Sequence, residues 1–133
     1  RKAVRSNNMS CVLHVSNAHG SVLLTADIEA RDEQALLARA AAHLHSDVLL
    51  VPHHGSGTSS TPSFIAAVGA REAIIPVGYR NRFQHPRADV VDRYAGSRLW
   101  RTDRDGAVRV RLAAAGLSLT AYRDEYRRYW HGQ

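Results

Sequence analysis

The stretch that decides the fold is Val48-Leu49-Leu50-Val51, an apolar run that ends at Pro52 and continues as His53-His54-Gly55-Ser56. A short apolar run closed by a proline is typical of a buried strand. Adjacent histidines directly after such a strand suggest a metal site, because neutral imidazole is a common ligand of zinc or manganese. Histidines whose ring nitrogens are satisfied by loop carbonyl groups are the alternative, and the pair alone does not decide between them.

On either side of this stretch, amphipathic runs alternate with short apolar ones. Apolar spacing and capping residues predict helices at 32–45, 62–68 and 87–95, the first with Asp32 as its N-cap. Apolar runs predict further strands at 10–15, 21–26, 73–77, 98–101, 107–112 and 117–122. The first two and the last two of these strands form hairpins, and residues 103–106 form a turn. Strands that alternate with helices between two hairpins predict a layered α/β domain.

Composition limits the class of protein. The 133 residues suit one domain that buries its own core, and no apolar run approaches the roughly 20 residues that span a bilayer. The sequence does not begin with Met, so we expect a piece of a longer protein. A single cysteine excludes an internal disulfide, and we expect Cys11 to be a buried thiol.

The net charge of +6 comes almost wholly from arginine, since Lys2 is the only lysine. Arginine favours bidentate contact with phosphate or carboxylate, which suggests a polyanionic partner. A bias in genome composition explains the arginines equally well.

Two more polar clusters follow predicted strands, where open α/β sheets place their sites. In the run 25–29, Asp27 is positioned to bind a metal or to cap the next helix, and capping is the commoner use. The run 78–86 holds Arg80, Asn81, Arg82 and His85, which suit a phosphate-binding loop or, alternatively, a solvated basic loop. An acid, a His-His-Gly-Ser turn and a later histidine in one strand–helix series suit a two-metal hydrolase.

These motifs resemble the C-terminal part of the ComEC family, the competence-related DNA-uptake channel proteins. The matching stretches are residues 7–13, 23–29, 50–60, 77–86 and 99–108. The most specific are His-His-Gly-Ser-x-Thr-Ser-Ser and Gly-Tyr-Arg-Asn-Arg. The resemblance implies that residues 1–122 are the C-terminal half of a metallo-β-lactamase-like αββα sandwich, followed by a charged aromatic tail at 123–133.

The resemblance also implies a role for each site residue. Asp27 corresponds to the aspartate that bridges two divalent metal ions, zinc or manganese, and His53 to the catalytic histidine ligand that follows it. His85 corresponds to the last histidine of the metal site. The resemblance places His54, Ser56 and Thr58 in support of the ligands or facing the substrate, and Arg80, Asn81 and Arg82 on phosphate.

Two departures from the family pattern affect these expectations. Ala26 stands where the family usually has glycine, which adds a methyl group beside Asp27. The signature motif His-x-His-x-Asp-His is absent from these 133 residues and lies upstream in the family. We therefore expect the isolated chain to lack most of the metal ligands and to be inactive.

The function implied is that of a metal-dependent phosphodiesterase, a nuclease for incoming DNA. It would be part of an inner-membrane channel protein whose soluble domain is extracytoplasmic. The alternative is a non-catalytic module that guides DNA, because nine arginines but only four aspartates lie between Arg80 and Arg111. Tyr79 and Phe83 are candidates for base stacking, although core packing is the commoner use. The expected partners are DNA, the rest of the polypeptide, and a second copy that covers an exposed apolar sheet face.

Overall fold

The computed structural model describes residues 6–128, and its centre is a five-stranded mixed sheet. The strands lie side by side in chain order: β1 (Leu13–Asn17), β2 (Gly20–Leu24), β3 (Val48–Leu50), β4 (Glu72–Ile75) and β5 (Arg98–Arg101). β1 pairs antiparallel with β2, and the remaining neighbours are parallel. Parallel neighbours need crossover connections, which are the helices α1 (Ala30–Ala40), α2 (Pro62–Val68) and α3 (Ala88–Arg93).

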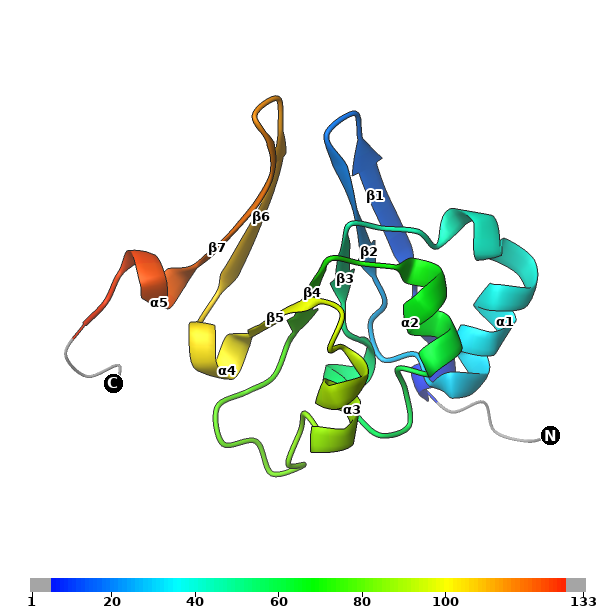
Figure 1. Cartoon of the computed structure of the whole chain (residues 1–133). Coiled ribbons are helices and arrows are strands. Elements are labelled where there is room, and N and C mark those ends of the chain that lie inside the picture. The colour runs from blue at the N-terminus through cyan, green and yellow to red at the C-terminus, as the bar shows by residue number, and fades with distance from the viewer. Residues whose placement is uncertain (1–5, 129–133) are drawn as a thin grey trace.

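The helices cover one face of the sheet and form the larger core (Figure 1). Alternate strand residues such as Leu49 and Ile75 point to this face and pack with Phe64 of α2 and Val90 of α3, all of them buried. α2 begins at the predicted Pro62 and ends against Gly69, whose φ of 60° closes the helix in the left-handed conformation. The prediction of helix 62–68 is confirmed.

A C-terminal hairpin, β6 (Val108–Ala113) and β7 (Gly116–Ala121), packs on the other face. It helps to bury Val48, Ile74 and Trp100. Its tip returns to the first hairpin of the sheet, where the side-chain amide of Asn17 donates a 3.1 Å hydrogen bond to the carbonyl of Leu112.

The same face stays open at β1. Leu13 and Val15 of β1 pair with Leu24 and Val22 of β2, and paired residues point to the same face of the sheet. Because Leu23, between them, points into the helix-covered core, the side chains of Leu13 and Val15 lie on the opposite face, where the C-terminal hairpin packs. They are 56% and 43% exposed. The sheet face that we predicted to be exposed is thus covered by the C-terminal hairpin at β3–β5 and exposed to solvent only at the edge strand β1, among the described residues.

Three predictions for residues 10–45 are corrected, in addition to small shifts of strand boundaries. Glu29, not Asp32, is the N-cap of α1; Asp32 occupies the third helical position and accepts a 3.0 Å hydrogen bond from the Glu29 backbone in a capping box. The helix also ends at Ala40 and is followed by the 3₁₀ turn η2 (Ala41–His43). Cys11 is exposed because it precedes β1, which itself lies at the sheet edge.

The remaining short elements are η1 (Ser6–Met9), η3 (Pro52–Gly55), α4 (Thr102–Asp105) and α5 (Tyr122–Glu125). α4 replaces the turn predicted at 103–106. α5 overlaps the start of the predicted tail, whose residues 129–133 lie outside the described part of the chain. Within residues 6–128, no helix combines the length and apolar character needed to cross a bilayer. The architecture is a mixed α/β fold, and the metallo-β-lactamase-like assignment stays a prediction.

Candidate functional site

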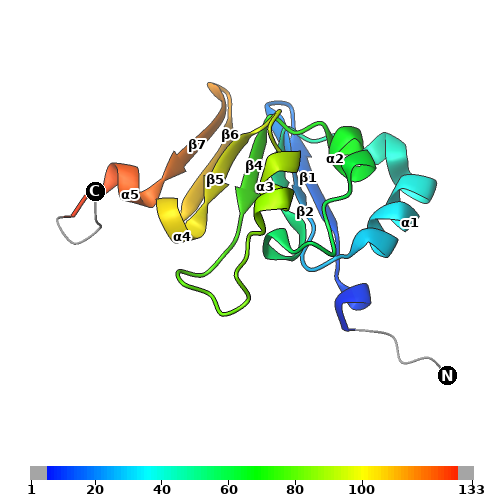
Figure 2. The ribbon, with the colours of Figure 1, turned by 60° about the horizontal axis from the view of Figure 1, so that its bottom comes forward.

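Three loops carry the predicted site residues, and they follow the parallel strands β2, β3 and β4. Because these strands run the same way, their carboxyl ends meet at one edge of the sheet, where the β4–α3 loop projects (Figure 2). Hydrogen bonds join the first loop to β3 and to the loop that follows it. The hydroxyl of Thr25 donates to the Leu50 carbonyl at 2.6 Å, and the His53 backbone N–H donates to the Ala26 carbonyl at 3.0 Å.

His54 contacts Asp27 directly. Its Nε2 lies 3.3 Å from Oδ1 of Asp27, while its Nδ1 lies 2.6 Å from the Pro76 carbonyl oxygen. A carbonyl only accepts, so Nδ1 carries a proton, and the neutral ring then turns the Nε2 lone pair toward a carboxylate. A proton or a metal ion between these atoms relieves that repulsion. Two ligands of one tetrahedral ion, with bonds of about 2.1 Å, lie roughly 3.4 Å apart, so the pair fits as two neighbouring ligands.

His53 is oriented by hydroxyl groups of its own loop. Its Nδ1 lies 3.2 Å from the Thr58 hydroxyl and 3.8 Å from Oε1 of Glu29. The Thr58 hydroxyl in turn lies 3.0 Å from the hydroxyl of the buried Ser56. Ser56 and Thr58 therefore constrain the ring plane of His53.

The backbone of the histidine turn is held in a costly conformation. His53 and His54 have φ values of 50° and 58°, in the left-handed region that residues with a Cβ rarely adopt. Gly55 follows with φ 78°, and a Cβ there would lie 2.6 Å from Cβ of Pro86. The close approach of the β4–α3 loop thus requires glycine at 55. Strain of this kind concentrates at functional sites.

His85 completes the cluster from the β4–α3 loop. Its ring centre lies 6.2 Å from that of His53, and its buried Nδ1 has no hydrogen-bond partner within residues 6–128. Burial lowers the pKa of His85, and electrostatic interaction with the neighbouring His53, His54 and Arg87 lowers it further. A neutral ring with an unused nitrogen is suited to bind a cation.

The predicted phosphate contacts of this loop divide into two kinds. Asn81 is used internally: its amide donates to the His85 carbonyl at 2.7 Å and accepts from the His85 backbone N–H at 2.9 Å. Arg80 and Arg82 are exposed and lie over the rings of Tyr79 and Phe83, at 5.2 and 4.8 Å. Asn81 thus shapes the loop, whereas the two guanidinium groups remain available to phosphate.

Most of the other arginines between 80 and 111 form ion pairs with nearby acids. Ion pairs of 2.7–3.8 Å join acidic residues to Arg87, Arg93, Arg101, Arg104 and Arg109. The free positive charge of this stretch is therefore concentrated more in the β4–α3 loop than the sequence count suggested.

The donor set for a metal is partial. Within the described residues, no three His, Cys, Asp or Glu side chains converge closely enough to hold a metal ion. Asp27 and His54 fit as two ligands, and catalytic zinc sites usually take three from protein.

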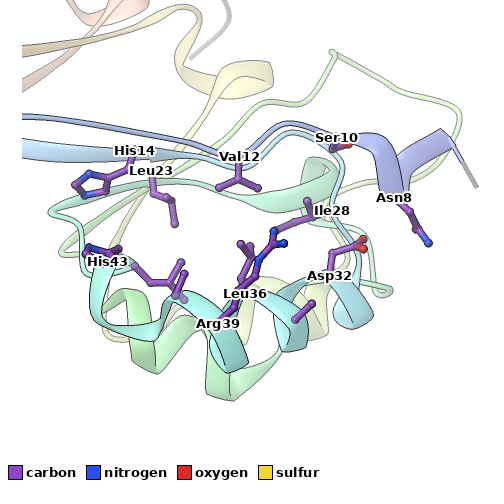
Figure 3. Close-up of a pocket in the computed structure, with 13 residues that line it drawn as sticks. Asn8, Ser10, Val12, His14, Leu23, Ile28, Asp32, Leu36, Arg39 and His43 are labelled. Atoms are coloured by element: carbon purple, nitrogen blue, oxygen red, sulfur yellow. The ribbon is translucent and has the colours of Figure 1, made fainter.

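A separate hollow of about 400 Å³ lies between β1 and α1 (Figure 3). Its wall includes Val12, Leu23 and Leu36, with His14 and His43 at one end, and Arg39 points from α1 toward the strands. It contains none of the predicted site residues, so we do not assign the chemistry to it.

Two contributions to the site were missed by sequence reasoning. Glu29 was named only as part of a strand-end cluster, yet it both caps α1 and approaches His53. The ring of Phe83 stacks on that of His85, with centres 5.9 Å apart and planes at 18°. Its exposure, 63%, corrects the expectation of core packing, as does the 69% exposure of Tyr79.

Comparison with known proteins supports the resemblance. The chain is 36% identical to competence protein ComA of Neisseria gonorrhoeae over 132 residues, which are 98% of this chain and 19% of ComA. It is thus homologous to a segment of a competence protein.

Two further relatives match over much of the chain. ComE operon protein 3 of Bacillus subtilis is 36% identical over 107 residues, covering 79% of this chain and 14% of that protein. Recombination protein 2 of Haemophilus influenzae is 41% identical over 87 residues, covering 65% and 11%. The chain spans less than a fifth of the length of these relatives. No protein-family profile and no solved structure matches it.

Proposed function

We propose that the protein takes part in DNA uptake during natural transformation, and that this chain supplies part of a metal-dependent phosphodiesterase site that cleaves incoming DNA. Homology to competence proteins supports the process. The observation that carries the chemistry is the Asp27–His54 pair, with its atoms 3.3 Å apart and the rings of His53 and His85 beside it.

In this proposal the residues divide into ligands and phosphate contacts. Asp27 and the histidines 53, 54 and 85 would hold divalent ions, zinc or manganese, in a metallo-β-lactamase-like domain. Such ions neutralise charge on the reacting phosphate and lower the pKa of water. Ser56 and Thr58 keep the His53 ring in place, and Arg80 and Arg82 bind phosphates of the substrate.

The second candidate is a non-catalytic module that guides DNA. The partial donor set favours it, as do the exposed guanidinium groups of the β4–α3 loop. Such a module would bind DNA without metal, with affinity that falls steeply as salt rises.

An assay of the cleavage of labelled DNA in the presence of Mn²⁺ or Zn²⁺ distinguishes the two candidate functions. We compare this chain with a longer stretch of the natural protein that extends before Arg1, each also as Asp27→Ala and as the control Asp124→Ala. Cleavage by the longer form alone, abolished by Asp27→Ala and kept by Asp124→Ala, supports the hydrolase. Salt-sensitive binding by both forms without cleavage supports the guiding module.

The partners and the location follow from the same proposal. The remainder of an inner-membrane channel polypeptide, with this domain outside the cytoplasm, would carry the missing ligands. In the isolated chain, Leu13 and Val15 would be covered by a second copy of the exposed edge strand β1. Light scattering at high concentration should then report a dimer, shifted to monomer by Val15→Lys. A wild-type monomer contradicts this part of the proposal.

A further inference from the structure

The β4–α3 loop presents two aromatic rings to solvent beside the candidate site. Tyr79 is 69% and Phe83 63% exposed, and the loop stands out from the edge of the sheet (Figure 2). Neither residue belongs to the two apolar cores. Their positions are therefore not explained by the packing of the fold.

Each ring is paired with the arginine next to it in sequence. The guanidinium carbons of Arg80 and Arg82 lie 5.2 and 4.8 Å from the ring centres of Tyr79 and Phe83. An exposed cation–π contact is weaker than the stacking of a nucleobase on an aromatic ring. A base is thus able to replace the guanidinium on the ring, and the released guanidinium is then free to bind the adjoining phosphate.

The ring of Phe83 lies next to the candidate metal ligands. Phe83 is stacked on His85 at 5.9 Å, and His85 lies 6.2 Å from His53. Phe83 and His85 also line an open groove of about 1060 Å³, together with the hydroxyl-bearing Ser56 and Thr58. A nucleotide whose base stacks on Phe83 has its phosphate within reach of the histidine cluster.

We propose that Tyr79 and Phe83 form a base-stacking platform that makes this site select single-stranded over duplex DNA. In a duplex, the faces of the bases are covered by their neighbours, so only an unpaired base presents a face to the rings. Every base has such a face, so the platform carries little sequence preference. The inference rests on the proposal that the site acts on DNA, but it needs neither metal nor cleavage.

The test is binding without metal, measured by fluorescence anisotropy in a chelator at fixed salt. The probes are a labelled 12-nucleotide thymidine strand, an abasic strand of the same length and charge, and a duplex. The wild-type chain should prefer the thymidine strand to both others. Phe83→Ala and Tyr79→Ala should each weaken that complex about ten-fold and leave abasic binding unchanged, because only the stack is lost. Phe83→Trp should restore it.

Tyr126→Ala is the matched control, since Tyr126 is 51% exposed and stacks on Tyr122, outside the candidate site. It should not change any affinity, and far-UV spectra should confirm that all variants fold. Equal losses on thymidine and abasic strands, no single-strand preference, or no binding at all would each overturn the platform.

Asp27→Ala distinguishes failure of the platform from failure of the hydrolase. It should abolish cleavage by the longer form and keep the preference for thymidine over abasic strands. If no form cleaves and the preference persists, the hydrolase fails and the platform stands.

Discussion

The loops that follow β3 and β4 meet at the candidate site and are built in opposite ways. Residues 51–61 are fastened on several sides: buried Glu33 accepts hydrogen bonds from the backbone of Ser60 and from the backbone and hydroxyl of Thr61. The Ser59 hydroxyl donates to the Ile28 carbonyl at 2.7 Å. In residues 76–87, by contrast, Asn81 closes the turn and most side chains from 78 to 84 face solvent. The first loop holds donors at fixed positions, and the second offers a surface to a polymer.

The largest effect on stability is expected from removing the hydrogen bonds that hold the loop 51–61. Glu33→Ala leaves three donors without their acceptor in a buried site and should lower the free energy of unfolding by about 3 kcal/mol. Urea denaturation followed by circular dichroism measures it. Glu125→Ala, at an exposed carboxylate, should change stability by less than about 0.5 kcal/mol. A similar small value for both variants would show that Glu33 does not hold the loop.

The next largest effect on stability is expected from a substitution at the contact between the two loops. Gly55→Ala places a Cβ 2.6 Å from Cβ of Pro86, at a φ of 78°, and should cost about 2–3 kcal/mol. Gly78→Ala, in the exposed loop, has no atom within 4 Å of the new Cβ and should be nearly neutral. Thermal unfolding of the pair measures the difference, and equal melting temperatures would contradict the proposed packing requirement.

A smaller effect of opposite sign is expected at the end of β2. Ala26 has a φ of 50°, so Ala26→Gly removes the strain of a left-handed conformation. The same substitution raises the conformational entropy of the unfolded chain, which offsets part of that gain. The net result should be a stabilisation of about 0.5 kcal/mol. Ala35→Gly, in the middle of α1, should instead destabilise by about 1 kcal/mol. If both substitutions destabilise equally, the conformation at residue 26 is not a source of strain.

The smallest effect concerns the charge of His85. Its pKa is lowered in the folded protein, so below pH 6.5 the unfolded chain binds a proton that the folded chain does not. Stability should therefore fall slightly as pH decreases from 6.5 to the folded pKa, and His85→Gln should flatten this dependence. An NMR titration without metal should show His85 protonating below pH 6.5. Protonation above that value would contradict the environment described.

Sequence reasoning located the order of strands and helices better than their boundaries: β1 spans 13–17 rather than 10–15, β2 spans 20–24 rather than 21–26, and β4 spans 72–75 rather than 73–77. Helix 62–68 and strand 98–101 are confirmed at both boundaries, and Pro62 is the local signal that marks the start of the helix. The clusters at 25–29, 51–56 and 78–86 do lie at one sheet edge, as the alternation of strands and helices predicts.

The failures share a physical cause, which is that local patterns do not report what covers a residue. Cys11 lies in an apolar run that the sheet leaves at its edge, and Phe83 lies in a loop that no second layer covers. The left-handed turn at His53 and His54 runs into the close contact between Gly55 and Pro86, which are 31 positions apart in sequence. Nothing in the sequence around Gly55 indicates that it contacts Pro86, or the reverse.

The strand order has a consequence for how the chain is made. Strands β1 to β5 pair strictly with the strand that precedes them in the chain, so each new strand emerging from a ribosome finds its partner already present. Only the last hairpin must reach back, through the contact of Leu112 with Asn17, 95 positions earlier. We expect this closure to form late, and a nascent chain stalled before residue 108 to keep the five-stranded order with one face uncovered.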